Sequence, residues 1–126
     1  MKKSTLVIWT VVLAFAIWGS LAYADAIVAN IQFPFKAEGK EFTAGKYRFD
    51  VNLQSSEITL RSETSGKGVL LPITTRLSDR GAEAIVVFDK EGDQYYLSEI
   101  YMPGLDGFEV KGATGKHTHV KVKAGK

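Results

Sequence analysis

The chain has 126 residues, with 16 lysine and arginine against 14 aspartate and glutamate side chains, and it contains no cysteine. The lack of cysteine excludes a disulfide framework and a lipid anchor attached to a cysteine at a cleavage site. The stability of the protein must therefore come from an ordinary hydrophobic core. A single domain of this length is large enough to bury such a core.

The first 24 residues have the three-part layout of a secretory signal peptide. Lys2 and Lys3 precede an apolar run over residues 6–18, and Ala22-Tyr23-Ala24 fits the small-x-small pattern of a cleavage site. Residues 1–24 are therefore predicted to be a signal peptide, and residues 25–126 to be a single domain that is periplasmic or extracellular. The alternative is a retained membrane anchor, which needs about 20 apolar residues. A glycine and a serine break the run before that length, so no membrane span is expected after cleavage.

Beyond the leader, the hydrophobic pattern is typical of β-strands. Apolar residues alternate with polar ones from Tyr47 to Leu53, which predicts a strand with one buried face. The same period runs from Ile27 to Phe35, where Pro34 predicts an edge position or a bend, because proline donates no backbone hydrogen bond. Residues 69–73 and 84–88 are apolar on both faces and are expected near the middle of a sheet. Shorter or less regular runs complete the set over residues 58–60, 95–102 and 118–122.

Turn signals separate these runs at short intervals. Glycines follow or lie between polar residues at Glu38-Gly39-Lys40, Ser65-Gly66-Lys67, Asp79-Arg80-Gly81 and Glu91-Gly92-Asp93. No apolar 3.6-residue period persists beyond the leader. The sequence therefore predicts an all-β domain, an antiparallel β-sandwich or small barrel of about seven to eight strands. The predicted core comprises Ile31, Phe33, Tyr47, Phe49, Val51, Leu60, Leu71, Ile73, Val86, Phe88, Leu97 and Val110.

The charge of the predicted mature chain is uneven. Loss of the leader leaves 14 basic and 14 acidic residues, but the segment 110–126 carries five lysines and no acid. Such an end can attract nucleic acid, anionic lipid or an acidic polymer. It can equally be a lysine-rich strand that keeps a sheet edge soluble. We expect the second role and no nucleic-acid partner, because the segment contains no arginine.

His117 and His119 are the chain's only histidines. In a strand both point to one face, where they could hold copper, zinc or nickel if a carboxylate from elsewhere supplied a third ligand. Lys121 and Lys123 share that face and disfavour a bound cation. The sequence therefore favours an exposed strand face here, with no metal site and no cofactor.

Catalytic signatures are missing from the sequence. It has no nucleophile elbow, no phosphate-binding glycine loop and no metalloprotease histidine pair. The prediction is a protein without enzymatic activity and without catalytic residues.

Aromatic residues gather in the segment 95–102. Strict alternation places Tyr95, Leu97, Glu99 and Tyr101 on one face, and Tyr96, Ser98, Ile100 and Met102 on the other. One face should be core, so the other would expose an aromatic residue that could contact a partner or stack on a ligand. The alternative is a sheet that is covered on both sides. The candidate surface-contact residues are Tyr96, Tyr101, His117, His119, Lys121 and Lys123.

Two sequence elements resemble a group of small exported bacterial β-domain proteins of uncharacterised function. One is Phe33-Pro34-Phe35 followed by Ala44-Gly45-Lys46-Tyr47, which is similar to the group's PF-x-F and AG-x-Y elements. The other is the segment 92–101, which is similar to its G-x-x-Y-x-L strand. A threonine at position 43 replaces the usual proline. The resemblance implies export and a β-fold, and it assigns no catalytic or binding residue.

Together these features predict an exported, non-enzymatic β-domain that contacts a protein or polymer of the cell envelope or outside the cell. One alternative is a β-barrel or sandwich that binds a small molecule in its interior. Another is a metal-binding module built on His117 and His119.

Overall fold

The computed structural model describes residues 26–78, 83–105 and 107–125, so the predicted signal peptide and the predicted turn at Asp79-Arg80-Gly81 lie outside the described residues. The described residues form strands and connections, with no helix that could cross a membrane. The strands are β1 (Ala26–Ile31), β2 (Phe35–Ala37), β3 (Lys40–Phe42), β4 (Gly45–Asn52), β5 (Glu57–Ser62), β6 (Gly68–Pro72), β7 (Thr75–Leu77), β8 (Ala84–Glu91), β9 (Gln94–Tyr101), β10 (Gly107–Glu109) and β11 (Thr118–Ala124).

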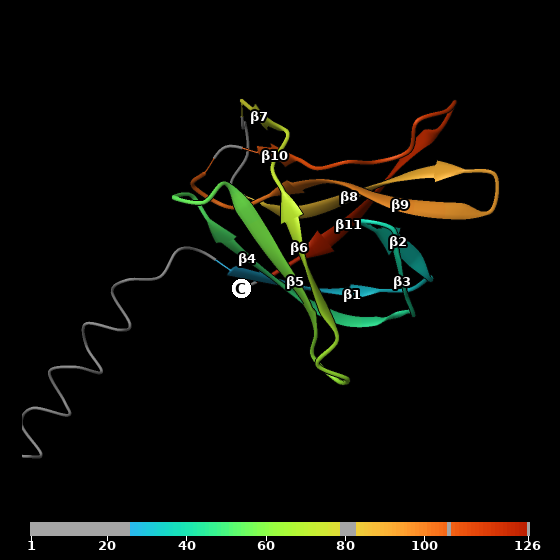
Figure 1. Ribbon diagram of the computed structural model, residues 1–126, viewed down its shortest axis with the longest axis horizontal. Coiled ribbons are helices and arrows are strands. Elements are labelled where there is room, and N and C mark those ends of the chain that lie inside the picture. Colours follow the sequence, from blue (N-terminus) through green and yellow to red (C-terminus); the bar gives the residue numbers. More distant parts are fainter. Residues whose placement is uncertain (1–25, 79–82, 106, 126) are drawn as a thin grey trace, which may run out of the picture.

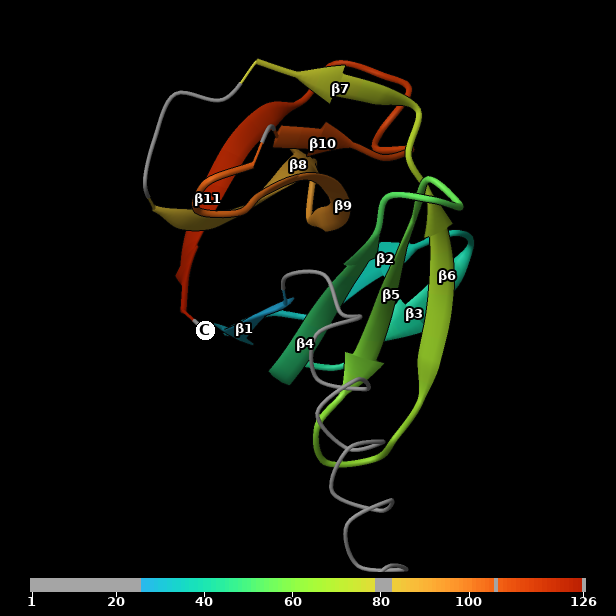
Figure 2. The same cartoon turned by 90° about the vertical axis from the view of Figure 1, so that its left-hand side faces the viewer.

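These strands form two sheets (Figure 1). The four-stranded sheet has the order β1-β4-β5-β6. The seven-stranded sheet has the order β11-β8-β9-β10-β7, and the β2–β3 hairpin joins it through a parallel contact between β2 and β9. Figure 2 shows β4, β5 and β6 on one side of the molecule and β8, β9, β10 and β11 on the other.

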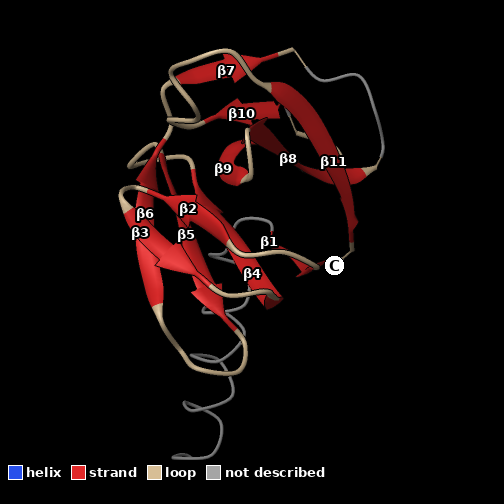
Figure 3. Cartoon of the chain, turned by 90° about the vertical axis from the view of Figure 1, so that its right-hand side faces the viewer, coloured by secondary structure: helices blue, strands red, loops and turns tan. Residues whose placement is uncertain are grey.

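The all-β prediction is confirmed, and the two sheets form a sandwich-like arrangement that does not close into a barrel. At its C-terminal end β11 reaches β1, where Val28 and Gly125 exchange backbone hydrogen bonds of 2.6 and 2.9 Å (Figure 3). The described residues contain more strands than the seven or eight predicted. The additional ones, β2, β3, β7 and β10, have three residues each, which is too short for an alternating pattern to be read from the sequence.

The proline prediction is confirmed, since β1 is an edge strand of its sheet and Pro34 lies in the bend between β1 and β2. Of the two strands expected at the middle of a sheet, β8 lies between β11 and β9 as predicted. The prediction is wrong for β6, which is an edge strand with Leu70 exposed. An apolar residue on the outer side of an edge strand gives the same two-faced pattern as a central strand, so the pattern alone does not separate them.

The core lies between the sheets. Most of the predicted core is buried there, and the predicted Phe33 and Ile73 are half-buried against it. Phe33 stacks on Tyr95 at a centroid distance of 3.8 Å and meets Phe88 edge to face at 5.0 Å. Buried residues that the predicted core omitted include Ile27, Phe35, Phe42, Ile58, Ile100, Met102 and Phe108.

A β-bulge in β9 overturns the predicted faces of that strand. Phe88 pairs with Leu97, but the preceding Val87 pairs with Glu99, which leaves Ser98 as an extra residue. An extra residue shifts the alternation by one position. Leu97 and Ile100 therefore both face the core at 0% exposure, whereas Glu99 lies on the opposite, outer face of the sheet.

Candidate metal centre

The predicted contact residues on β9 and β11 share the outer face of the seven-stranded sheet. Residues that pair across strands point to the same side. His119 pairs with Asp89, which pairs with Tyr96, and Lys123 pairs with Ile85, which pairs with Tyr101. The structure thus collects Tyr96, Tyr101, His119, Lys121 and Lys123 on one face, although β8 separates the tyrosines from the lysines.

Asp89 is the buried charged residue of this face, with 3% exposure. The segment between β10 and β11 crosses the sheet above it. The backbone N–H of Val110 donates to the carbonyl oxygen of Ser98 at 2.8 Å. The backbone N–H of Ala113 donates to Asp89 Oδ2 at 3.0 Å. The crossing segment therefore holds one carboxylate oxygen in place and shields Asp89 from solvent.

Gly112 permits this close crossing. A Cβ at this position would overlap Asp89 Oδ2 and would lie 3.1 Å from Ser98 Oγ. Only a residue without a side chain leaves both groups where they are. The side chain of the bulged residue Ser98 thus lies close to Gly112, in the segment that covers Asp89.

The other carboxylate oxygen, Oδ1, faces two imidazole rings. It lies 3.4 Å from Nε2 of His117 and 3.4 Å from Nε2 of His119. The rings are stacked, with centroids 5.3 Å apart and planes 27° apart. Asp89 Oδ1 is buried and makes no hydrogen bond to any described residue. The two 3.4 Å separations are close enough for ion pairs, but only if the imidazoles are protonated.

The orientation of His117 is fixed by a second contact. Its Nδ1 lies 2.7 Å from the carbonyl oxygen of Gly115, and because a carbonyl only accepts, the ring donates its Nδ1–H. In a neutral ring the Nε2 lone pair then faces Asp89 Oδ1. Histidines that bind metals commonly donate their other N–H to a backbone carbonyl in this way.

The spacing of these atoms suits a single cation. Donor atoms about 2.0 Å from a tetrahedral ion lie about 3.3 Å from each other, which matches the two 3.4 Å separations. One ligand atom from each of Asp89, His117 and His119 lies within 4.8 Å of the others. A proton on one imidazole nitrogen would form a hydrogen bond only between that nitrogen and Asp89 Oδ1. A metal ion would bind the oxygen and both nitrogens.

The sequence pattern indicates both histidines as candidate ligands but not Asp89. The signal that points to Asp89 is a carboxylate directly after the apolar run of β8, a strand that the pattern placed in the centre of a sheet. The register that sets Asp89 opposite His119 depends on the fold, and it cannot be read from either strand alone.

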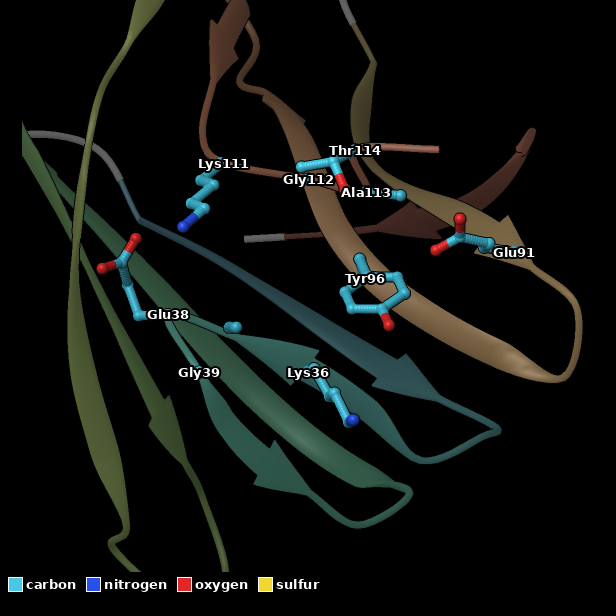
Figure 4. A pocket seen from close by; sticks show the side chains of 10 residues that line it. Lys36, Glu38, Gly39, Glu91, Tyr96, Lys111, Gly112, Ala113 and Thr114 are labelled. Carbon is cyan, nitrogen blue, oxygen red and sulfur yellow. The ribbon is translucent and has the colours of Figure 1, made fainter. Parts of the chain in front are cut away.

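A separate cleft is lined in part by the crossing segment (Figure 4). It has a volume of about 360 Å³ and opens at the surface between the β2–β3 turn and residues 111–114. Tyr96 lies near its centre, with Lys36 and Lys111 among its lining residues. Glu38 and Glu91 also line it, so the charges of the cleft are mixed. Two of its lining residues, Gly112 and Ala113, also cover Asp89.

Comparison with protein-family models, with curated proteins and with solved structures gives no match for this chain.

Proposed function

We propose that the chain is an exported, non-enzymatic β-sandwich protein that binds a divalent transition metal ion through Asp89, His117 and His119. The observation that carries the proposal is the buried Asp89 Oδ1, which makes no hydrogen bond to the described residues and faces two imidazole nitrogens. Leaving a buried polar atom without a partner costs about 1–3 kcal/mol, and more for a charged group. A bound cation would offset that cost.

The donor set favours particular metals. Two imidazole nitrogens and one carboxylate oxygen suit zinc, copper and nickel. Calcium and magnesium prefer shells made of oxygen atoms. We therefore expect Zn²⁺, Cu²⁺ or Ni²⁺ as the ligand.

The lysines of β11 are a weaker obstacle than the sequence suggested. Lys121 pairs with Val87 and Lys123 with Ile85, so they lie progressively farther along the strand from the Asp89 row. Two residues of a strand span about 6.8 Å. Lys121 therefore lies within the Debye length of about 8 Å at physiological salt and is only partly screened, whereas Lys123, about twice as far along the strand, is largely screened. Contact with an envelope protein or polymer through the same outer face stays a prediction.

Calorimetric titration with Zn²⁺, Cu²⁺ and Ni²⁺ tests the proposal on purified protein expressed from the full chain. We expect one ion per chain, and a loss of affinity of at least about 100-fold in Asp89→Asn, His117→Gln and His119→Gln. Asp50→Asn is the matched control, since Asp50 is an exposed carboxylate of the other sheet that pairs with Arg48. Equal affinity in wild type and Asp89→Asn would refute the site.

Apo-protein stability separates a metal site from a structural ion pair. Asparagine keeps the shape of Asp89 and can still accept from Ala113, but it removes a buried charge. If the site is built for a metal, apo Asp89→Asn should melt at or above the wild-type temperature. If charged imidazoles neutralise Asp89, the same variant should melt lower, because two imidazolium groups lose their partner.

A further inference from the structure

The proposed site does not enclose its ion. Among the described residues, only Asp89, His117 and His119 are grouped closely enough to share a metal. Zinc, copper and nickel take four or more ligands, and sites with three protein ligands keep a position for water or another molecule. Asp89 approaches from the buried side, at 5% side-chain exposure, whereas the side chains of His117 and His119 are 28% and 52% exposed. The remaining positions of a bound ion would therefore face solvent.

An open depression lies beside His117. Its lining residues come from the end of β8, the β8–β9 turn, the connection before β11 and the first residue of β11; they are Lys90, Gly92, Lys116, His117 and Thr118. His117 belongs both to this depression and to the proposed metal site, so its imidazole ring is where the two adjoin.

The charge around this depression would be positive once a metal is bound. A divalent ion with the single carboxylate of Asp89 carries a net charge of about +1. Lys116 forms no ion pair with any described residue. Lys90 points to the opposite face of the sheet, since it pairs with Thr118 and Tyr95 and its Nζ lies 5.7 Å from the ring centroid of Tyr95. The exposed coordination position and Lys116 would favour an anion over a neutral molecule or a cation.

We infer that the metal-loaded protein binds a small oxyanion, such as a phosphate or a carboxylate, at the open coordination position, with Lys116 as the main second contact. This inference rests on the proposed metal binding. The ion supplies the bond to one oxygen, and Lys116 stabilises the charge of the others. The apo protein has no such site, because Asp89 would repel an anion.

Glu91 is the internal competitor for this position. It lies two residues after Asp89 in β8, and its carboxylate is close to the backbone of Gly115, where a Cβ would overlap Glu91 Oε2. Gly115 also accepts the hydrogen bond from His117. If Glu91 turned onto a bound ion, it would close the shell and lower the positive charge of the depression.

Cobalt substitution tests the inference, because the visible spectrum of Co²⁺ reports changes among its ligands. The probe is inorganic phosphate added to the Co²⁺-loaded protein at constant ionic strength, with acetate in a second series to distinguish phosphate from carboxylate. We expect a saturable spectral change with each anion. The phosphate dissociation constant should rise about two- to fivefold in Lys116→Gln, while the Co²⁺ affinity stays unchanged. Lys123→Gln, which removes a lysine of the same face outside the depression, is the matched control.

The outcomes separate this inference from the proposed function. A protein that fails to bind Co²⁺ refutes the metal site itself. A protein that binds Co²⁺ but shows no response to either anion refutes only the open position. A response that appears only in Glu91→Gln shows that Glu91 closes the shell, and it also overturns the inference. Equal phosphate affinity in wild type and Lys116→Gln overturns the role of the lysine.

Discussion

Asp89 is held in an arrangement that costs free energy in the absence of a cation. Its Oδ2 accepts from the backbone of Ala113, so the carboxylate cannot simply turn to the solvent. Its Oδ1 lies against two imidazoles at 3.4 Å without a hydrogen bond. Unfavourable groups of this kind are typical of functional sites, where the surrounding structure maintains them. This single residue therefore distinguishes the outer face from an ordinary solvated sheet surface.

Gly112→Ala tests whether the cover of Asp89 positions the carboxylate. The added Cβ would overlap Asp89 Oδ2 and crowd Ser98 Oγ, so the segment or the carboxylate must move. We expect metal affinity to fall about tenfold, with a loss of stability of about 1–3 kcal/mol. Gly125→Ala is the control, since a Cβ there meets nothing within 4 Å. Calorimetric titration and thermal melting of both variants check this, and unchanged metal affinity in Gly112→Ala would exclude the positioning role.

Phe49→Ala tests the packing between the sheets. Phe49 is fully buried in β4, at 0% exposure, and the cavity left by its ring should destabilise the domain by about 3–5 kcal/mol. Small domains have a free energy of unfolding of about 5–15 kcal/mol, so the variant would lose much of its stability. Leu70→Ala, at an edge position with 54% exposure, should change the stability by no more than about 0.5 kcal/mol. Urea denaturation measures both, and similar midpoints would contradict the assignment of faces.

At the scale of strands, the alternation of apolar and polar residues predicts the buried face correctly where the strand is regular, and it fails where a bulge interrupts the strand. In β4 the alternating pattern matches burial, so Tyr47, Phe49 and Val51 were identified correctly as core. In β9 the bulge at Ser98 inserts one residue, and the faces beyond it were wrong. A bulge depends on the strands and segments that pair with it. Here the backbone N–H of Val110 donates to the carbonyl oxygen of Ser98, so the sequence of β9 alone does not reveal the bulge.

Lys121 and Lys123 are expected to protect the edge of the larger sheet. β11 pairs along its length with β8 only, and a single bridge from Val28 to Gly125 covers its C-terminal end. Exposed lysines on such an edge oppose pairing with another chain. The double variant Lys121→Gln/Lys123→Gln should therefore aggregate faster, with stability changed by no more than about 0.5 kcal/mol. Light scattering during incubation measures this.

The matched control for edge protection removes two positive charges elsewhere. Lys46→Gln/Arg61→Gln changes exposed residues of β4 and β5, which are both interior strands of the four-stranded sheet. We expect no increase in aggregation in this control. If wild type is instead retained on an anionic matrix at about 0.15 M salt, and only the Lys121→Gln/Lys123→Gln variant is released, the lysines form a docking surface.

At the scale of the whole molecule, the proposed site joins parts of the chain that are far apart in sequence. Asp89 comes from the central strand β8, His119 from the edge strand β11, and His117 from the connection just before it. Two of the three residues were visible in the sequence as a His-x-His pair. The third depends on which strand pairs with β11 and in which register, which is a property of the complete fold.

The export prediction also concerns the whole chain. Two lysines, an apolar run and Ala22-Tyr23-Ala24 have the order of a cleavable leader, so mass spectrometry of the exported protein should give an N-terminus at Asp25. Trp9 and Trp18 are the only tryptophans, and both would leave with the leader. The processed protein should therefore show tyrosine emission only, whereas the unprocessed chain should show tryptophan emission. A membrane-bound form that keeps tryptophan emission would instead indicate a retained anchor.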